Sequence, residues 1–561
     1  MTKDKLKQII TEQNLLTAEV FESAVEFAEK NKISIEEAIV NEGLLEEEKI
    51  GTVIAEEIGF PFVNLQNENI QDKYLEYLPE DVATAQEALI FSEDETTFKL
   101  ATTNPGNFKL IKNLEKVVDK EARVYYAPPT TIKKFLLFYK NNLPQDFRDF
   151  VDKFEKTRND DVIVDMVDRV VDYAYENKAS DIHIEPGSNE VIIRVRIDGL
   201  LRKVASYPLS IHPKIVFLIK IKSHLKTDEH GMTQDGRFEH TVKDGNSKDK
   251  FDIRVSVLPV THGENIVMRV LSEKSRRLSL DELGLMPEDF NKIDNMVKRP
   301  HGMVIVTGAT GAGKTTTLYA ILQLVDKQKL NVVTIEDPVE YAMEGIQQIQ
   351  VNSQKNLTFA SGLRSIVRQD PDMIMVGEIR DAETASIAVN ASLTGHVLFS
   401  TLHANDTATV FSRMAELDVE SGLSATSLSM IISQHLSRKV CHYCAEEHDA
   451  TKEEVAYANS SPYLQNVLAD HFPDIENIEK ARFKKGKGCS MCGGTGYLGR
   501  IGIFEIMEVN DEIRELAARG EPAHIIKKKA LEQGMKPLEY WELYHLIKGT
   551  TTLTELLSPV S

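Results

Sequence analysis

A short apolar segment, residues 303–307, runs directly into a glycine-rich loop. The loop has the spacing G-x-x-x-x-G-K-T from Gly308 to Thr315. Its glycines allow successive backbone N–H groups to point inward, and the helix that follows adds the positive end of its dipole. We expect Lys314 to reach the β- and γ-phosphates and the Thr315 hydroxyl to reach Mg²⁺. The segment therefore predicts a site for a nucleoside triphosphate, formed by Gly308, Ala309, Thr310, Gly311, Ala312, Gly313, Lys314, Thr315 and Thr316.

Glu378 follows a second apolar segment, residues 372–377. Transfer of a phosphoryl group to water needs a bound metal and a carboxylate that orients or deprotonates the attacking water. An acid directly after a buried strand has no packing reason to be there, so we expect Glu378 to be this carboxylate. The alternative is that Glu378 only caps a helix over residues 382–393.

Other polar residues end two further apolar segments. Glu336 and Asp337 precede Pro338 and are second candidates for an acid near metal-bound water, although Asp-Pro is also an ordinary turn. His403 follows the segment 397–401 and has two possible roles, either bonding the γ-phosphate or serving structure alone. In open α/β sheets ligands bind outside the carboxyl ends of the strands, so these strand ends should converge on one site.

Arg254 and Arg269 lie on segments that alternate apolar and polar residues. An arginine supplied by another domain or subunit can stabilise the charge that develops during phosphoryl transfer, and its effect is roughly 10³ to 10⁵ in rate. We expect both arginines to serve this reaction. The alternative is a solvated face of a sheet on which they pair with Asp252 or Glu264.

All four cysteines of the chain fall into two C-x-x-C pairs. Two such turns place four thiolates around a tetrahedral Zn²⁺, and a reducing compartment disfavours disulfides. We expect structural zinc held by Cys441, Cys444, Cys489 and Cys492 in an element over residues 438–500, with a redox dithiol as the alternative.

The chain's 561 residues predict several domains. Residues 1–60 contain an internal repeat with an offset of 29 positions, and each copy predicts two short amphipathic helices joined at Asn14 or Gly43. The predicted order is an N-terminal docking or regulatory domain 1–140, a polar linker 141–160, an α+β domain 161–275, a second linker 276–283 and a nucleotide domain 284–561.

The net charge of −21 is spread over the whole length. Nucleic-acid binding requires clustered Lys and Arg, so we expect no nucleic-acid partner. No apolar run is long enough for a transmembrane helix, and the first residues lack the apolar core of a signal peptide. We expect a cytoplasmic protein that reaches a membrane only through partners.

The motifs resemble those of the hexameric ATPases of type II secretion and type IV pilus assembly. The resemblance covers nearly all of residues 160–555 and is specific, because several independent motifs occur in the same order. They are ASDIHIE (179–185), RVRIDG (194–199), QDGRF (234–238), HGE (262–264), TIEDPVEY (334–341), DPD (370–372) with GEIRD (377–381), and STLHAN (400–405).

The resemblance implies a multidomain α/β protein with a RecA-like P-loop NTPase core and a PAS-like α+β N2 domain. It assigns Glu336 to an acidic box, Glu378 to the Walker B position and His403 to a histidine box. Arg254 and Arg269 match N2-domain arginines that reach the nucleotide. It also implies a homohexamer that uses ATP and Mg²⁺ to act on an inner-membrane platform protein and a cytoplasmic adaptor.

The N-terminal module, a helical repeat over 1–60 followed by a small α/β part, resembles the MshEN module that binds cyclic di-GMP in some relatives. The second copy has Ser34, Glu36 and Glu57 where that motif has Arg, Gly and Gln, and the first copy has Lys5 and Lys7. These changes remove a cationic partner for phosphate and a close backbone approach. We therefore expect no tight binding of cyclic di-GMP and favour docking to the platform or adaptor.

The cysteine pairs and the additional N-terminal module are similar to those of extension and secretion ATPases and not to the retraction motors. We expect an ATPase that drives type IV pilus assembly and is peripheral to the inner membrane. The first alternative is the motor of a type II secretion system. A more remote alternative is a non-catalytic scaffold switched by nucleotide.

Overall fold

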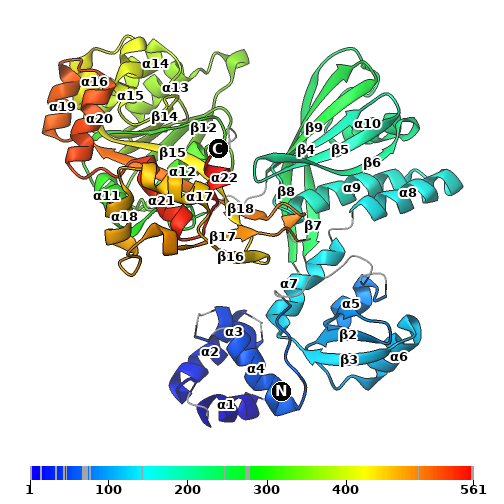
Figure 1. The fold of residues 1–561 in the computed structure, drawn as a ribbon. Helices are drawn as coiled ribbons and strands as arrows, with labels where there is room; N and C mark the ends of the chain where they lie inside the picture. Colours follow the sequence, from blue (N-terminus) through cyan, green and yellow to red (C-terminus); the bar gives the residue numbers. More distant parts are fainter. Residues whose placement is uncertain are drawn as a thin grey trace. The chain divides into compact units, whose positions relative to one another are not determined.

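The computed structural model describes residues 3–12, 15–31, 34–41, 44–45, 47–65, 74, 77–140, 143–244, 247–271, 278–489 and 492–557. The chain divides into two compact units (Figure 1). The first contains residues 1–149, 441–445 and 486–496, and the second contains residues 150–440, 446–485 and 497–561. None of the described helices has the length and hydrophobicity needed to cross a bilayer.

The first unit begins with four short helices, α1 (Lys3–Glu12), α2 (Ala18–Asn31), α3 (Ile35–Asn41) and α4 (Glu47–Ile58). The apolar positions of both repeat copies meet in their shared core, which contains Leu6, Ile10, Leu15, Leu16, Phe21, Val25, Ile35, Ile39, Leu44, Leu45, Ile50 and Ile54. Each copy thus forms two helices, as the repeat predicts. The predicted turn residues Asn14 and Gly43 lie outside the described residues.

A small α/β part completes the N-terminal module. Its elements are α5 (Glu80–Gln86), β1 (Ala88–Glu93), β2 (Thr97–Thr102), α6 (Phe108–Val118), β3 (Glu121–Tyr126) and α7 (Pro129–Lys140). Strand β2 pairs antiparallel with β1 and parallel with β3. The helical and α/β parts are closely packed, because a Cβ added at Gly51 of α4 would lie 2.3 Å from the ring of Phe62, which pairs with Tyr126 of β3, and 3.0 Å from Pro128.

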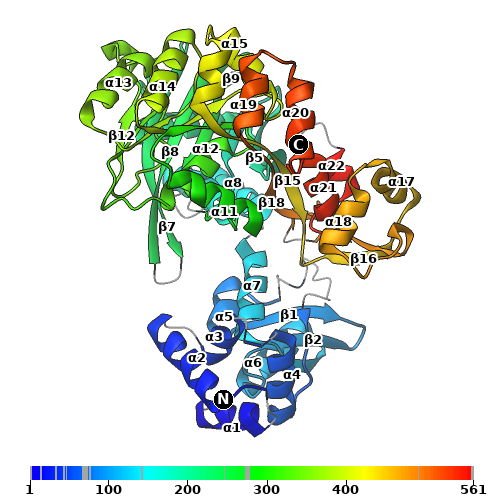
Figure 2. The same cartoon turned by 90° about the vertical axis from the view of Figure 1, so that its left-hand side faces the viewer.

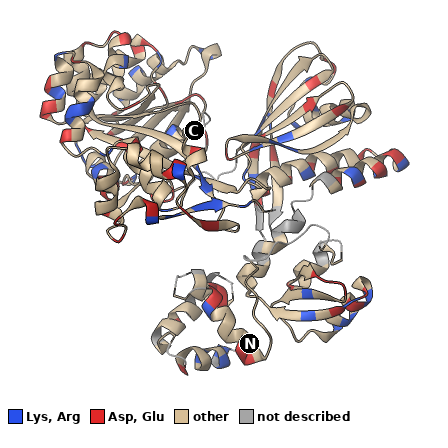
Figure 3. Ribbon diagram, in the orientation of Figure 1, with Lys and Arg blue, Asp and Glu red and all other residues tan. Residues whose placement is uncertain are grey.

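Residues 143–157 form helix α8 (Leu143–Thr157), within the range predicted to be a polar linker. Leu143, Phe147 and Phe154 are buried along it. The linker prediction missed this helix because acidic and basic residues dominate its composition, as Figure 3 shows along its length. Spacing, and not composition, carries the helical signal here.

The second unit contains a six-stranded antiparallel sheet in the order β6-β5-β4-β9-β8-β7. Its strands are β4 (Asp181–Pro186), β5 (Glu190–Ile197), β6 (Leu200–Pro208), β7 (Gln234–Asp244), β8 (Ser247–Val260) and β9 (Gly263–Leu271). Helices α9 (Asp161–Glu176) and α10 (His212–Lys222) contact each other and the sheet. This arrangement confirms the predicted α+β fold. Of the predicted second linker 276–283, residues 276 and 277 lie outside the described residues.

A seven-stranded sheet forms the core of the nucleotide domain, in the order β12-β11-β13-β14-β10-β15-β18. Only β18 is antiparallel to its neighbour. The strands are β10 (Gly302–Thr307), β11 (Val332–Glu336), β12 (Gln347–Gln350), β13 (Met373–Val376), β14 (Val397–Leu402), β15 (Leu428–Val440) and β18 (Tyr497–Glu508). Figure 2 shows this domain after a turn of 90° about the vertical axis. The four predicted strands are β10, β11, β13 and β14, and their parallel pairing confirms the predicted RecA-like core.

Buried apolar residues join this sheet to helices, which form two hydrophobic cores. The helices are α11 (Pro287–Val297), α12 (Lys314–Gln323), α13 (Phe359–Ile366), α14 (Ala382–Leu393), α15 (Thr409–Glu416), α16 (Ser421–Ser427), α19 (Asp511–Ala518) and α20 (Ala523–Glu532).

A further core lies beneath the small sheet of β16 (Ala445–Asp449) and β17 (Arg482–Gly486) and contains residues of the adjacent helices. These helices are α17 (Lys452–Ser460), α18 (Leu464–His471), α21 (Leu538–Ile547) and α22 (Leu553–Leu556).

Candidate functional site

The phosphate loop connects β10 to α12, and three of its glycines have positive φ. Gly308, Gly311 and Gly313 have φ angles of 142°, 83° and 87°. Strand β15 lies close behind the loop, because a Cβ on Gly308 would come within 2.3 Å of the Gln434 carbonyl oxygen. The Gln434 side chain also donates to the Ala312 carbonyl at 2.6 Å. Glycine is therefore required at position 308 by both conformation and space.

Lys314, the first residue of α12, turns its ammonium group back into the loop. Its Nζ donates to the carbonyl oxygens of Gly308 at 2.8 Å and Ala309 at 2.9 Å. Burial lowers the pKa of Lys314, and the negative charge of Glu378 opposes that change. The ammonium group thus lies against the loop that the sequence predicts to bind phosphate.

Glu378, Arg380 and His403 come together at the carboxyl ends of β13 and β14. The Glu378 carboxylate lies 2.5 Å from Arg380 Nη2 and 3.8 Å from His403 Nε2, and its side chain is 17% exposed. Asp381 caps α14 by accepting from the Thr384 N–H at 2.8 Å. Asp381, and not Glu378, therefore caps this helix.

The loop that carries His403 is attached to the end of the phosphate-loop strand. The Thr307 hydroxyl donates to the Ala404 carbonyl at 2.7 Å and accepts from the Ala404 N–H at 2.9 Å. Ends of three neighbouring parallel strands, β13, β14 and β10, thus supply Glu378, His403 and Lys314 to one site. Sequence reasoning missed Arg380 as a site residue, although its position two residues after Glu378 was a usable signal.

Glu336 is placed differently from Glu378. It is 2% exposed, and its carboxylate accepts hydrogen bonds from Tyr319, Thr334 and Gln348. Burial raises the pKa of Glu336, and these hydrogen bonds oppose that change. Among the contacts of the described residues, none joins the Glu336 carboxylate to Glu378. The adjacent Asp337 is exposed.

Arginines form a row across the six-stranded sheet. Arg254 on β8 lies directly opposite Arg237 on β7 and Arg269 on β9. The Arg254 guanidinium donates to the carbonyl oxygen of Val339 at 2.9 Å, on the loop after β11, and Arg269 Nε donates to Asp181 at 3.1 Å. Like charges directly opposite one another in a sheet are unfavourable, so this row is suited to an anion.

The alternative partners Asp252 and Glu264 are not bonded to Arg254 or Arg269 by any contact found in the described residues. Glu264 pairs instead with the buried Lys220 at 2.6 Å. Arg237 was missed from the sequence because only the strand register places it beside Arg254.

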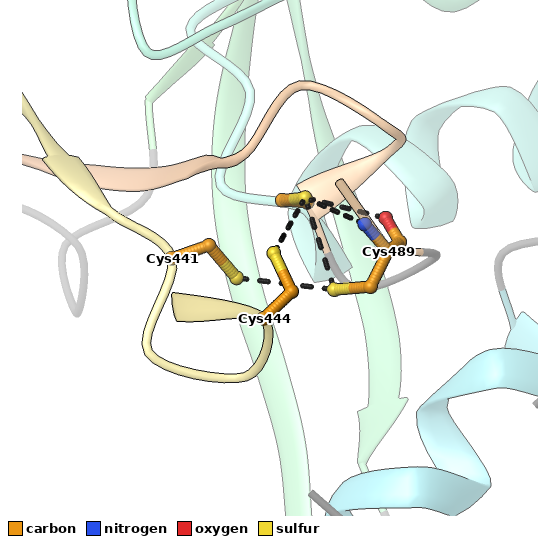
Figure 4. Close-up of side chains that lie close together, drawn as sticks. Cys441, Cys444 and Cys489 are labelled. Carbon is orange, nitrogen blue, oxygen red and sulfur yellow. Dashed lines mark hydrogen bonds between the residues drawn. The ribbon is translucent and has the colours of Figure 1, made fainter. Parts of the chain in front are cut away.

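The four cysteine sulfurs lie within 4.8 Å of one another (Figure 4). The Sγ atoms are 3.9 Å apart in the pairs Cys441–Cys489 and Cys444–Cys492, and 3.8 Å apart in Cys489–Cys492. Tetrahedral zinc with Zn–S bonds of about 2.3 Å requires sulfurs about 3.8 Å apart. The spacing fits zinc and is far longer than a disulfide bond of about 2.05 Å.

Backbone amides support the same interpretation. The N–H groups of Cys489 and Gly496 both donate to the Cys492 sulfur at 3.2 Å. Such bonds stabilise a thiolate, which is the form that binds a metal. The residues present therefore fit a four-cysteine zinc site.

Residues 156–558 match the family described as Type II/IV secretion system protein, and residues 58–139 match the MshEN domain. The first match covers most of the chain. The protein therefore belongs to the Type II/IV secretion system protein family.

Individual relatives support this membership. The chain is 32% identical to the "Type IV pilus assembly ATPase PilB" of Myxococcus xanthus, over 99% of this chain and 98% of that one. It is 41% identical to the "Type II secretion system protein E" of Klebsiella pneumoniae, over 65% of this chain and 69% of that one. The solved structure of the Legionella pneumophila ATPase DotB matches 69% of this chain and 93% of its own with a TM-score of 0.50 and 20% identity, which indicates a shared fold.

Proposed function

We propose that this protein is an ATP hydrolase that powers type IV pilus assembly. The observation that carries the proposal is the convergence of Lys314, Glu378 and His403 at the carboxyl ends of neighbouring parallel strands. The phosphate loop would hold the triphosphate, with Lys314 at the β- and γ-phosphates. Mg²⁺ held through Thr315 would neutralise phosphate charge.

Glu378 is the group proposed to orient the attacking water. Arg380 holds one of its oxygens and leaves the second on the side of His403, 3.8 Å away. A carboxylate fixed in this way is positioned to accept a proton from water, and His403 is positioned to respond to the γ-phosphate. Arg254 and Arg269 would then add positive charge from the six-stranded sheet as the phosphoryl group leaves.

Further proposals follow from family membership. The protein would act as a homohexamer on the cytoplasmic side of an inner membrane, contacting a platform protein and an adaptor. We propose that Glu336 stabilises the phosphate loop and the end of β11, because its carboxylate accepts hydrogen bonds from Tyr319 and Thr334. Zinc bound by the four cysteines would be structural.

A type II secretion motor is the second candidate, favoured by the 41% identity to the secretion protein of K. pneumoniae. The pilus relative from M. xanthus matches 99% of this chain, including the N-terminal module, whereas the secretion relative matches 65%. The longer match favours pilus assembly. Proteins recovered with the tagged chain from its own cells decide between them: pilins support the first candidate, and secretion-channel components support the second.

Glu378→Gln is the direct test of the hydrolase. We expect it to bind ATP and to lose hydrolysis by roughly 10² to 10⁴, the contribution of a positioned general base. Lys314→Ala should lose ATP binding as well. Glu383→Gln is the matched control, because Glu383 is an exposed residue of α14 that pairs with Arg364 on the surface.

Phosphate release and fluorescent-nucleotide binding measure the two properties separately. Wild-type turnover in Glu378→Gln would contradict the assignment of Glu378. Absence of phosphate release from the wild-type protein under all assembly conditions would favour the non-catalytic scaffold.

A further inference from the structure

The cysteine knuckle is encoded inside the nucleotide domain but packs with the N-terminal module. We define the knuckle as residues 441–445 and 486–496, which join residues 1–149 in one compact unit. The strands on either side, β15 and β18, belong to the other unit. The knuckle is therefore a short excursion from the ATPase core that ends against a different domain.

Tyr443 makes the contact that the sequence could not reveal. It is one of the two residues between Cys441 and Cys444, and its ring lies edge-on to the ring of Phe135 on α7, with centroids 6.3 Å apart and planes at 80°. This is the edge-to-face geometry that aromatic pairs prefer, and such pairs contribute beyond the area they bury. Phe135 is 3% exposed, so the contact reaches the core of the module.

The start of α4 is attached to the start of α7. Glu47, the first residue of α4, accepts hydrogen bonds from the hydroxyls of Thr130 and Thr131 in the first turn of α7, the latter at 2.7 Å. Helix α7 therefore connects the helical repeat and the α/β part. A contact made by α7 is therefore linked to both parts of the module.

The four cysteines control the shape of the loop that presents Tyr443. The two halves of the knuckle are joined by Cys441 N–H to the Gly496 carbonyl at 2.8 Å and by Lys487 N–H to the Cys444 carbonyl at 3.0 Å. Each of these bonds includes one of the predicted zinc ligands, Cys441 or Cys444. Four thiolates this close repel one another unless a cation neutralises them, so metal binding would fix the loop and the tyrosine in it.

We propose that the knuckle is a metal-dependent dock for the N-terminal module, with Tyr443 as the residue that engages α7. This rests on the proposed zinc site. The partner is the chain's own helix α7, and the consequence is that loss of zinc releases α7 from the knuckle. Bound metal thereby governs whether the N-terminal module is held to the knuckle.

Hydrogen exchange in the full-length protein tests the dock. Tyr443→Ala, with its zinc retained, should accelerate exchange in α7 by roughly threefold to tenfold, the size expected from losing one aromatic pair. Tyr443→Phe keeps the ring and should exchange like wild type. Phe108→Ala, which removes a 68% exposed ring on α6, is the control for loss of an aromatic ring elsewhere in the module and should exchange like wild type. Removal of zinc by a chelator should reproduce the effect of Tyr443→Ala.

Metal content, measured first, separates the dock from the site on which it rests. A protein purified without zinc that also fails to take it up overturns the zinc site and with it the metal dependence. Bound zinc with unchanged α7 exchange in Tyr443→Ala overturns the dock alone. Acceleration in Tyr443→Ala without any change on chelation overturns the metal dependence.

Discussion

Three adjacent arginines on one face of a sheet are unfavourable unless something negative neutralises them. Among Arg237, Arg254 and Arg269, Arg269 already has a carboxylate partner, Asp181. Arg254 instead donates to the backbone oxygen of Val339, three residues beyond Glu336 on a loop of the nucleotide domain. No carboxylate is paired with Arg254 among the described residues, so its positive charge can be used by a phosphate.

Arg254→Ala is expected to lower kcat by roughly 10³ or more, the effect of removing an arginine finger. Affinity for ADP should change far less, because the charge that needs Arg254 develops in the transition state. Lys250→Ala is the control on the same strand, where Lys250 pairs with Glu239 in solvent. Steady-state hydrolysis and ADP titration measure both quantities, and equal losses in the two variants would contradict a specific role for Arg254.

Local spacing was sufficient to predict the glycine turn between β10 and α12, because Gly308 to Gly313 form one continuous stretch of backbone. Glu378 and His403 could be paired because both follow strands whose ends must meet. The burial of Glu336 could not be predicted, since it depends on Tyr319 and Gln348, which only the folded chain brings to its carboxylate.

Among the elements, α21 carries a buried histidine in an aromatic environment. His545 is 4% exposed, and burial, with smaller effects of Lys548 and His435, lowers its pKa to about 4. An unfolded histidine titrates near 6.5. Between these values the unfolded chain binds a proton that the folded chain does not, so stability falls as pH decreases from about 6.5 to about 4.

A decrease from pH 7 to pH 5 should therefore lower the free energy of unfolding by about 2 kcal/mol through protonation of His545 in the unfolded chain. In His545→Gln we expect this part of the pH dependence of the free energy of unfolding to be lost, even if the substitution itself lowers stability at pH 7. Urea unfolding at both pH values, followed by the fluorescence of Trp541, measures the difference. His524→Gln, at an exposed position on α20, should keep the wild-type pH dependence; an equal pH dependence in His545→Gln would refute this account.

In the N-terminal helices, the residues that differ from the cyclic di-GMP motif have partners within the chain. Lys5 pairs with Glu57 at 2.8 Å and Lys7 with Glu22 at 2.6 Å, so both cations of the first copy have carboxylate partners. Ser34 exchanges hydrogen bonds with Glu37 at the start of α3. A phosphate would have to displace these acids.

Titration calorimetry of the full-length protein with cyclic di-GMP should accordingly give no submicromolar constant. Glu57→Gln releases Lys5 and is the variant in which weak binding should become detectable if charge is the obstacle. Tight binding by the wild-type protein would overturn the prediction and assign the helical repeat a sensing role.

Elements with strict periodicity could be predicted, and those with mixed composition could not. The helix α14 has the predicted bounds, because helical spacing is uninterrupted in it. Helix α8 was missed because three buried residues are distributed among many charged ones.

At the scale of the whole molecule, the sequence indicates the domains but not which segments pack together. The knuckle illustrates this, since Phe135 and Tyr443 lie in different predicted domains and no spacing rule connects them. The same limit applies to catalysis. Only the folded chain shows that Arg254 reaches the loop after β11 of its own nucleotide domain.

This internal contact leads to a prediction about how copies of the chain cooperate. If Arg254 and Glu378 serve one site from one chain, each chain must contain both to hydrolyse ATP. Mixing Arg254→Ala with Glu378→Gln should then restore no activity beyond the sum of the two variants. If the arginine instead came from a neighbouring copy, mixed assemblies would contain some sites with both groups intact, and hydrolysis would recover. Different tags on the two variants, followed by sequential affinity purification, ensure that the measured particles contain both. Recovery in those particles would show that Arg254 acts on a neighbouring chain, and its absence would show that each chain completes its own site.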